Sequence, residues 1–513
     1  MPTDPPEDIT PYDRYRYTSN AFAQSHPARL ATVAAAFGIA SAPATGCRVL
    51  ELGCGDGSNL IPLAFYLPDS ACVGVDLART PIAAGCARIA RLELRNIELR
   101  QGNLIDACDD LGTFDYVIAH GLYSWVPDAV RPHILRVAAN RLADNGVAYI
   151  SYNALPGCRL RHLVRELLAF RFGPDARDAV SLGSIREFLG EFAQIESPSS
   201  AEYFALLKRE IAFVQKGPDN ALYHDDLAPD AKPFYLHEFV ADARNFGLQY
   251  LGEANLADMF TLAGAEPFDQ QLDAWSGGDW IAREQYHDFV KGRRFRQTLL
   301  CKASHRLRRD FGAEIVERFE LRSPLRLEDP SASPFDRTET AFRTRTQGVQ
   351  LVEPIAKCAL VLLERVYPDS IGFAALLAEC TSQCARAGVV YDKPDAKTAL
   401  TAMLWALVRA KCVELMRDPQ HGRVEPGPAP CVNALVRDAI TSGTHCVGPL
   451  HDAYELSDEV VAEMTFAMDA TRDRAALLRY ACERTGSEPA AAAGNLEELL
   501  AFLTRHGAFR ASS

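Results

Sequence analysis

Short apolar runs alternate with helical periodicity through the first third of the chain. The runs predict strands that end at Leu52 and Asp76, and further strands at residues 97–103, 114–119 and 147–152. Between the last two runs, apolar residues recur at helical spacing over residues 128–142. Strands and helices that alternate in this way predict an α/β fold with a doubly wound, mostly parallel, Rossmann-like sheet.

The pattern becomes helical after Gly157. Apolar residues at helical spacing predict helices over residues 160–216, which Gly217-Pro218 ends. Residues 248–254 suit a strand, and residues 279–308 predict one long basic helix. We therefore expect a helical middle domain over residues 166–330.

Two segments near the C-terminus repeat one order of elements. In residues 341–417 and again in residues 453–511, three predicted helices are flanked by short strands, an order that resembles winged-helix modules. Such modules often bind DNA, but these carry Asp and Glu throughout and no basic recognition helix. We expect winged-helix-like modules at residues 331–417 and 426–513 that offer protein-interaction or acceptor-docking surfaces, or a homodimer contact. Structural padding is the alternative.

Composition limits the classes of protein that remain. A chain of 513 residues is too long for one core, so roughly two to four domains are expected. The net charge of −13 argues against a nucleic-acid partner and favours a basic or lysine-rich acceptor. No apolar run is long enough for membrane insertion, and residues 1–17 lack a secretion signal. The 14 scattered cysteines suit a reducing cytoplasm, so we expect a cytoplasmic protein.

Metal binding is not expected. Cys380 and Cys384 lack a second pair at zinc spacing, and they are interpreted as two cysteines on one helix face.

The most informative motif follows the first strand. Glu51, Gly53, Gly55 and Gly57 form an alternating acid–glycine pattern, and the second strand ends in Asp76. Glycine tolerates positive φ and lets backbone N–H groups approach a ligand, while an acid at the end of the second strand suits a ribose. Strand, glycine loop, helix, strand and acid together predict an adenosine-binding site.

The spacing of the glycines favours S-adenosylmethionine over a dinucleotide. The dinucleotide fingerprint G-x-G-x-x-G requires a third glycine at position 58, where this chain has Ser58. Glu51 is also unsuited to a pyrophosphate, whose charge prefers amides and a helix N-terminus. Beside the ammonium and sulfonium of a methyl donor, the same carboxylate fits. A nicotinamide or flavin site and a purely structural turn remain as alternatives.

Longer phrases resemble one particular family. The core, from about residue 25 to 165, resembles a class I S-adenosylmethionine-dependent methyltransferase. The segments QSHPARL (24–30), HGLYSWVP (120–127), SYNALPG (151–157), YHDDL (223–227) and PFYLHEF (233–239) are similar to bacterial methyltransferases with a regulatory domain, a group that includes the rickettsial protein-lysine methyltransferases. The resemblance implies a methyltransferase domain with an N-terminal cap over residues 1–165.

The resemblance also implies roles for individual residues. Glu51, Gly53 and Gly55 would contact the methionine part of S-adenosyl-L-methionine, and Gly57 would close the loop. Asp76 would hold the ribose, Leu77 would pack on the adenine, and Asn103 and Leu104 would lie at its edge. His120 would begin the segment beneath the departing methyl group.

The acceptor site can be predicted from the chemistry of methyl transfer. A lysine acceptor must lose a proton and be oriented, and His120, Tyr123, Trp125 and Asn153 are the candidate catalytic residues for this task. A helix-start histidine and half-buried aromatics that brace a loop are the structural alternatives. DNA and glutamine N-methyltransferases of this fold carry Asn/Asp-Pro-Pro-Tyr where this chain has His-Gly-Leu-Tyr, which argues against those acceptors.

Two further segments are candidates for a lid over the cofactor. The arm over residues 10–38 offers the candidate contacts Tyr17, Asn20, Gln24 and His26. The loop over residues 220–239 is either a solvated connector or a second lid that brings His224, Asp225, Tyr235 and His237 to the acceptor.

Two functional classes remain after these observations. The first is a protein methyltransferase that N-methylates lysine side chains and uses its appended domains to present a polypeptide. The second is a small-molecule methyltransferase that tailors a natural product. A closed, mostly apolar pocket behind Trp125 would favour the second class.

Overall fold

The computed structural model of the chain describes residues 10–17, 20–173, 175–196, 198–260 and 266–510. The expectations for residues 1–9, which include part of the N-terminal cap and of the segment without a secretion signal, lie outside this range. None of the described helices is long and apolar enough to cross a membrane.

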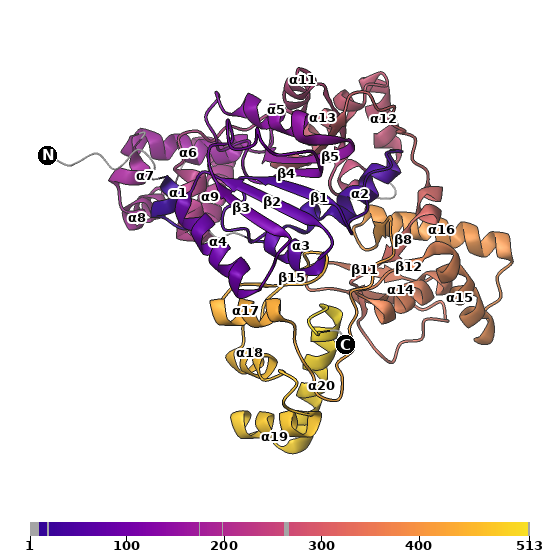
Figure 1. Ribbon diagram of the computed structural model, residues 1–513. Coiled ribbons are helices and arrows are strands. Elements are labelled where there is room, and N and C mark those ends of the chain that lie inside the picture. The colour runs from indigo at the N-terminus through magenta and orange to yellow at the C-terminus, as the bar shows by residue number, and fades with distance from the viewer. Residues whose placement is uncertain (1–9, 18–19, 174, 197, 261–265, 511–513) are drawn as a thin grey trace.

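A seven-stranded sheet forms the centre of the molecule (Figure 1). Its strands are β1 (Arg48–Leu52), β2 (Ala71–Asp76), β3 (Ile97–Gln101), β4 (Phe114–Ala119), β5 (Leu142–Asn153), β6 (Leu248–Glu253) and β7 (Phe295–Lys302). They lie in the order β3-β2-β1-β4-β5-β7-β6. The first five are parallel, and β7 runs antiparallel to both of its neighbours. The predicted doubly wound sheet is therefore confirmed.

Helices cover both faces of this sheet. The elements around it are α1 (Pro11–Arg14), η1 (Ala23–Ser25), α2 (Pro27–Ala36), α3 (Leu60–Tyr66), α4 (Arg79–Arg91), α5 (Arg131–Arg141), α11 (Leu236–Arg244), η4 (Leu256–Met259), α12 (Glu266–Ser276) and α13 (Trp280–Lys291). Leu30 of α2 and Leu63 of α3 belong to the core on one face, whereas Ile134 of α5 and Phe239 of α11 belong to the core on the other.

A separate helical bundle lies beside the C-terminal ends of the strands. It comprises α6 (Arg159–Phe172), α7 (Ala176–Ala179), α8 (Leu182–Ala193), η2 (Pro198–Ser200), α9 (Ala201–Lys216), α10 (Asp219–Ala221) and the π-helical turn η3 (Leu222–Asp226). Val164, Ile185 and Ile211 form part of its own small core. The bundle confirms the helices predicted over residues 160–216.

The segment expected as one long basic helix is a helix followed by a strand. Gly292, at φ +56°, caps α13 in the left-handed conformation, and β7 then pairs with β5 and β6. Arg296 is fully buried, with Asp288 2.8 Å from its Nε and Glu253 as a further partner. The prediction of a helix over 279–308 is wrong because these carboxylates neutralise an arginine inside the sheet. Residues 166–330, expected as one helical middle domain, therefore contribute to the bundle, to the central sheet and to the first of two C-terminal modules.

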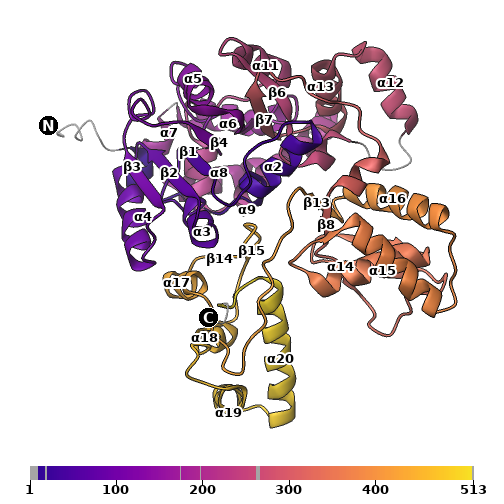
Figure 2. The ribbon, with the colours of Figure 1, turned by 45° about the vertical axis from the view of Figure 1, so that its right-hand side comes forward.

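The chain ends in two lobes, coloured orange and yellow in Figure 2. The first C-terminal module, residues 313–416, contains η5 (Ala313–Arg318), β8 (Glu320–Arg322), β9 (Arg326–Leu327), β10 (Thr340–Arg343), β11 (Gly348–Leu351), α14 (Pro354–Val366), β12 (Ile371–Gly372), α15 (Phe373–Arg386), α16 (Lys393–Arg409) and β13 (Glu414–Met416). The second C-terminal module, residues 430–510, contains α17 (Ala434–Ser442), β14 (Cys446–Val447), β15 (Ala453–Tyr454), α18 (Glu459–Phe466), α19 (Arg474–Thr485) and α20 (Pro489–Arg505).

The two modules differ in how they join the rest of the protein. The core of the first is continuous with the core beneath the large sheet, because Leu321, Leu360 and Leu404 belong to the same apolar cluster as Leu30. The second has a core of its own. Cys380 and Cys384 both lie buried on α15, as expected for two cysteines on one helix face. The likeness to winged helices stays a prediction.

Candidate active site at the glycine loop

The loop after β1 turns through three glycines in the left-handed region. The φ angles of Gly53, Gly55 and Gly57 are +73°, +55° and +73°, values at which a side chain is strained. A neighbouring helix also approaches this loop closely: a Cβ on Gly85 of α4 would lie 2.4 Å from the carbonyl oxygen of Asp56. The motif therefore needs glycine for both its conformation and its packing.

Glu51 lies beneath the loop with one oxygen unbonded. Its Oε1 accepts a hydrogen bond from Asn59 Nδ2 at 2.9 Å, whereas no described group bonds Oε2. The side chain is buried, and this burial raises the pKa of Glu51 to about 8. A buried carboxyl oxygen without a partner suits a cationic ligand, because an unpaired buried polar group is costly.

Asp76 stands at the end of the neighbouring strand. Its Oδ2 accepts the N–H of Gly55 at 2.8 Å, and its Oδ1 accepts the N–H of Ala78 at 2.8 Å. Burial raises the pKa of Asp76, and both N–H groups oppose this shift. The acid is thus tied to the glycine loop, where a ribose hydroxyl would compete for the same oxygens.

The residues expected around the adenine differ in exposure. Leu77 is 52% exposed beside Asp76, so its side chain is available to a ring. Asn103 is exposed, and its Oδ1 accepts the N–H of Ile105 at 3.1 Å. Leu104 is buried in the core over β4 and does not offer its side chain to a ligand.

These features fit S-adenosyl-L-methionine. Glu51 would bind the ammonium, Asp76 the ribose, and Leu77 with Asn103 the adenine, while the backbone of the glycine loop follows the methionine part. The unpartnered Oε2 of Glu51 is the observation that carries this fit.

The N-terminal arm covers the loop. Arg16 forms an ion pair with Asp56 at 3.3 Å, and Asp13 accepts the N–H of Thr80 at 2.7 Å. The ring of Tyr12 stacks on His224 of η3, with 4.4 Å between centroids. The arm thereby joins the glycine loop, α4 and the helical bundle, as expected for a cap.

His120, at the end of β4, contacts two aromatic residues. Phe22 stacks on its ring at 3.5 Å between centroids, and the hydroxyl of Tyr149 lies 2.8 Å from Nδ1. Burial lowers the pKa of His120 to about 3, so the ring is neutral at physiological pH. The sequence indicated His120 but missed Phe22, because the N-terminal arm brings Phe22 to the site from outside the glycine motif. It also missed Asn59, which follows the glycine loop directly and bonds Glu51.

A pocket of about 240 Å³ opens beside His120, between β5, β7 and the bundle. We call it the Trp125 pocket. It is lined by Trp125, Asn153, Cys158, Arg161, His162, Arg165, Phe213, Asp225, Ala231, Arg294 and Phe295. Two of the expected catalytic residues, Trp125 and Asn153, therefore meet here. The charged lining differs from the closed, apolar pocket that would favour a small-molecule acceptor.

Asp225 is the carboxyl group of this pocket. Burial raises the pKa of Asp225 to about 7, and the adjacent Asp226 adds to the rise. The neighbouring arginines are already bonded: Arg161 donates to Asp226 at 2.8 Å, and Arg165 donates to the carbonyls of Asp225 and Ala228. Asp225 can therefore gain or lose a proton near neutral pH.

Tyr123 is not part of the pocket. Only 1% of its surface is exposed, and its ring packs against Phe234 and Phe239 at about 5 Å between centroids. A second aromatic segment, from residues 234–239, buries this side chain, which favours the interpretation of Tyr123 as a bracing aromatic. Its catalytic role stays a prediction.

The lid candidates separate into two groups. Asp225 lines the Trp125 pocket, as expected for a lid, whereas His224 contacts Tyr12 and Tyr15 of the N-terminal arm. Tyr235 and His237 lie against α13 instead, where His237 Nδ1 is 3.1 Å from Gln285. His26 faces away from the glycine loop and caps α2, because its Nδ1 accepts the N–H of Ala28 at 3.1 Å. Within the described residues, no cluster of His, Cys, Asp and Glu could hold a metal ion.

The fold and this site together define a class I S-adenosylmethionine-dependent methyltransferase. A methyltransferase domain model matches residues 50–148, and a model described as a predicted methyltransferase regulatory domain matches residues 218–302. The chain belongs to the methyltransferases that carry this regulatory domain.

Relatives occur in Rickettsia. The uncharacterised protein RP028 of Rickettsia prowazekii is 31% identical over 233 residues, which cover 45% of this chain and 93% of that protein. RP789 of the same organism is 36% identical over 317 residues, but the match covers 61% of this chain and only 56% of the relative's length. The structure of PKMT2 from Rickettsia typhi in complex with AdoHcy has a TM-score of 0.85, at 23% identity, over 96% of this chain and 99% of that one.

Proposed function

We propose that the protein methylates lysine side chains of a polypeptide. The Trp125 pocket supports this proposal, because Trp125, Asn153 and Asp225 line it and its Phe295 packs against His120. The likeness to PKMT2, whose name abbreviates a protein-lysine methyltransferase, supports it and extends through both C-terminal modules.

The residues of the pocket have distinct tasks in this proposal. Asp225 accepts a proton from the lysine ammonium, because a carboxyl with a pKa near 7 can act as a base at neutral pH. The Asn153 carboxamide orients the amine, and the Trp125 face covers the side-chain methylenes. Phe22 and His120 form an apolar, neutral surface that keeps water away. S-adenosylmethionine supplies the electrophilic methyl group.

Transfer of labelled methyl groups to lysine-rich histone protein tests the proposal. We expect methyllysine after acid hydrolysis, and no label when the acceptor's amines have first been blocked by acetylation. Label that resists blocking, or that appears only in small molecules of a cell extract, would contradict lysine methylation.

The pH profile of the same reaction tests the role of Asp225. The wild-type rate should rise as pH increases through about 7, where Asp225 loses its proton. Asp225→Asn should lower the rate at pH 7 about a hundredfold and move the rise to higher pH, where the lysine amine loses its own proton to solvent. A variant with an unchanged profile would exclude Asp225 as the base, without excluding lysine as the acceptor.

A further inference from the structure

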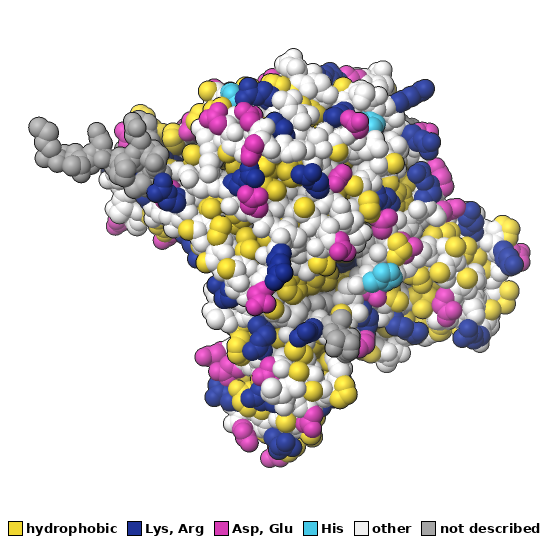
Figure 3. Space-filling model, viewed as in Figure 1, with side chains coloured by type: hydrophobic (Ala, Val, Ile, Leu, Met, Phe, Trp, Pro, Cys, Tyr) yellow, Lys and Arg dark blue, Asp and Glu magenta, His cyan; other side chains and the backbone are white. Residues whose placement is uncertain are grey.

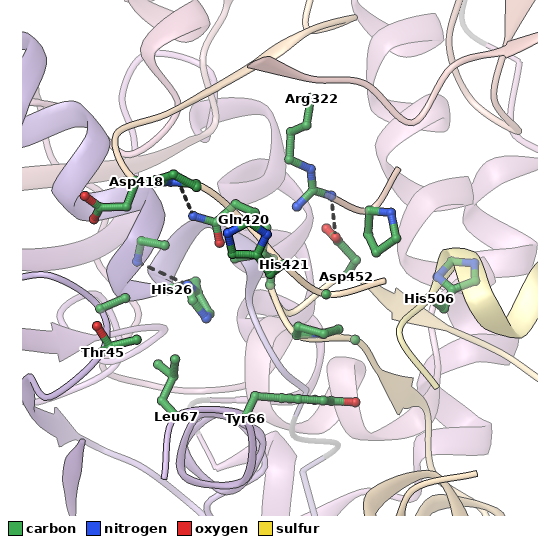
Figure 4. A pocket seen from close by; sticks show the side chains of 18 of the residues that line it. His26, Thr45, Tyr66, Leu67, Arg322, Asp418, Gln420, His421, Asp452 and His506 are labelled. Atoms are coloured by element: carbon green, nitrogen blue, oxygen red, sulfur yellow. Dashed lines mark hydrogen bonds and ion pairs between the residues drawn. The ribbon is translucent and has the colours of Figure 1, made fainter. Parts of the chain in front are cut away.

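A second, larger cavity lies where the sheet domain and the two C-terminal modules meet. Its volume is about 440 Å³, within the range of small-molecule sites. In Figure 4, His26 enters from the sheet domain, and Arg322 with Asp452 lies on the opposite wall. The Trp125 pocket has a different lining, so this junction cavity is separate from the acceptor site.

His26 presents an unmet hydrogen-bond donor to the junction cavity. Its Nδ1 accepts the N–H of Ala28, which leaves the ring proton on Nε2, and no described group accepts from Nε2. The side chain is only 1% exposed. A buried donor of this kind needs an acceptor, and the cavity is where one would lie.

Arg322 supplies a second unmet donor. Its Nη2 donates to Asp452 at 2.6 Å, but Nη1 has no hydrogen-bond partner among the described residues. Arg29 and Glu414 belong to the same ion-pair cluster as Arg322 and Asp452. Arg29 lies 2.9 Å from Glu414 and 3.0 Å from Asp452. The two arginines and two carboxylates balance in charge.

Arg505 leaves one positive charge on the wall. It donates to the carbonyls of Glu364 and Pro324, at 3.3 and 3.1 Å, and not to a carboxylate. Asp418, the other acid of the lining, is paired with Arg417. The rest of the lining combines polar residues with a rigid apolar wall of prolines and leucines. The polar residues are Thr45, Tyr66, Gln420, His421 and His506, and the wall comprises Pro43, Leu67, Pro368, Pro419, Pro449 and Leu450.

We propose that the junction cavity binds a small monoanion, whose carboxylate or phosphate oxygens meet His26 Nε2 and Arg322 Nη1 and whose body lies against the prolines. One excess cation, two unmet donors and a compact apolar wall fit this class of ligand. Such a molecule touches all three parts of the protein at once, so it fixes their relative orientation.

The junction cavity is also connected to the methyl-donor site. Ser25, the residue before His26, lies within 3.2 Å of Asn59 through its hydroxyl, and Asn59 bonds Glu51. Phe22, in the same segment, stacks on His120. An anion bound to His26 therefore acts on the segment that closes the cofactor site.

Anion binding by the full chain tests the proposal directly. The probes are sodium phosphate and sodium propionate, compared with sodium chloride at equal ionic strength, and the readout is the midpoint of thermal unfolding. We expect one probe to raise the midpoint above the chloride value. Phosphate alone would identify singly charged phosphate groups, such as phosphodiesters, as the ligand class, and propionate alone would identify carboxylates. No rise with either probe would overturn the proposal.

Three variants make the test specific. His26→Asn keeps a good cap for α2 but removes Nε2, and should weaken binding about tenfold. Thr45→Trp adds bulk at an exposed residue of the lining and should abolish binding. His133→Asn, at a half-buried position of α5 outside the cavity lining, should behave as wild type. An anion effect that persists in both lining variants would place the site elsewhere.

The link between the junction cavity and the methyl-donor site is tested by measuring the affinity for S-adenosylhomocysteine. The measurement is made with and without the probe anion that raises the unfolding midpoint. We expect the affinity to change in wild type and His133→Asn but not in Thr45→Trp. Equal affinities in wild type would overturn the link to the methyl-donor site. Because this readout needs no methyl acceptor, its failure is distinguishable from failure of the proposed lysine methylation.

Discussion

Glu51 acquires its chemistry from where the fold places it. In an exposed position its carboxyl would be ionised at neutral pH, but burial raises the pKa to about 8. The free protein therefore holds a proton there at pH 7. A cationic ammonium beside Oε2 stabilises the ionised form, so ligand binding and deprotonation of Glu51 are linked.

Calorimetry can detect this linkage. Binding of S-adenosylhomocysteine at pH 7 should release up to about one proton, seen as a dependence of the observed enthalpy on the ionisation enthalpy of the buffer. Glu51→Gln should abolish the release and weaken binding by about 1–3 kcal/mol. The same proton release in both proteins would contradict the assignment of the ammonium to Glu51.

The sequence predicts Tyr123 as a residue of the acceptor site, but its side chain is buried away from any acceptor. Tyr123→Phe should change turnover by less than about twofold and lower the free energy of unfolding by roughly 0.5–1.5 kcal/mol, because only a buried hydroxyl is lost. Parallel rate measurements and urea unfolding would show this. A large loss of rate at unchanged stability would restore its catalytic role.

At the scale of elements, the strands of the parallel half could be predicted from sequence. A strand covered on both faces needs a continuous apolar run, so the predicted span 114–119 coincides with β4. The strand β7 could not be predicted in the same way. Arg296 interrupts its pattern, and the carboxylates that neutralise it come from β6 and α13.

The contact between α4 and the glycine loop gives a matched pair of substitutions. In Gly85→Ala the new Cβ would lie 2.4 Å from the Asp56 carbonyl oxygen, so the loop must shift. We expect a loss of about 1–3 kcal/mol in stability and weaker binding of S-adenosylhomocysteine. Gly494→Ala in α20, which meets nothing within 4 Å, should instead stabilise by about 0.4–1 kcal/mol.

Thermal unfolding and calorimetry of both variants check this pair. If Gly85→Ala binds the ligand as tightly as wild type does, then close packing of α4 does not shape the loop.

For the whole molecule, positive and negative side chains are mixed over the visible surface (Figure 3). Figure 3 shows Lys and Arg interspersed with Asp and Glu over the visible face, without a continuous basic surface there. Ion pairs join the second C-terminal module to the sheet domain. Asp438 of this module forms ion pairs with Arg88 at 2.7 Å and Arg91 at 2.6 Å, both from α4.

The two modules should respond differently to deletion. Removing residues 426–513 deletes a lobe with its own core, so we expect a folded protein that is less stable but still binds S-adenosylhomocysteine. Removing residues 331–513 takes β13 from its pairing with β8 and opens the shared core, so this protein should not fold. Circular dichroism and calorimetry distinguish the two outcomes. A folded, binding-competent 1–330 fragment would contradict the continuity of that core.

Neighbouring residues along the chain determined the glycine loop, Asp76 and the strand ends, because left-handed turns and buried strands depend on local side-chain size and polarity. His120 and Asn153 were indicated because the ends of adjacent parallel strands meet at one edge of a sheet, and Trp125 was indicated by its aromatic side chain in the segment that follows His120. Tertiary structure alone decided that Tyr123 is buried, that Asp225 enters the Trp125 pocket, and that His26 faces a junction of three domains. Burial and charge pairing depend on groups far apart in sequence, and folding is what brings those groups together.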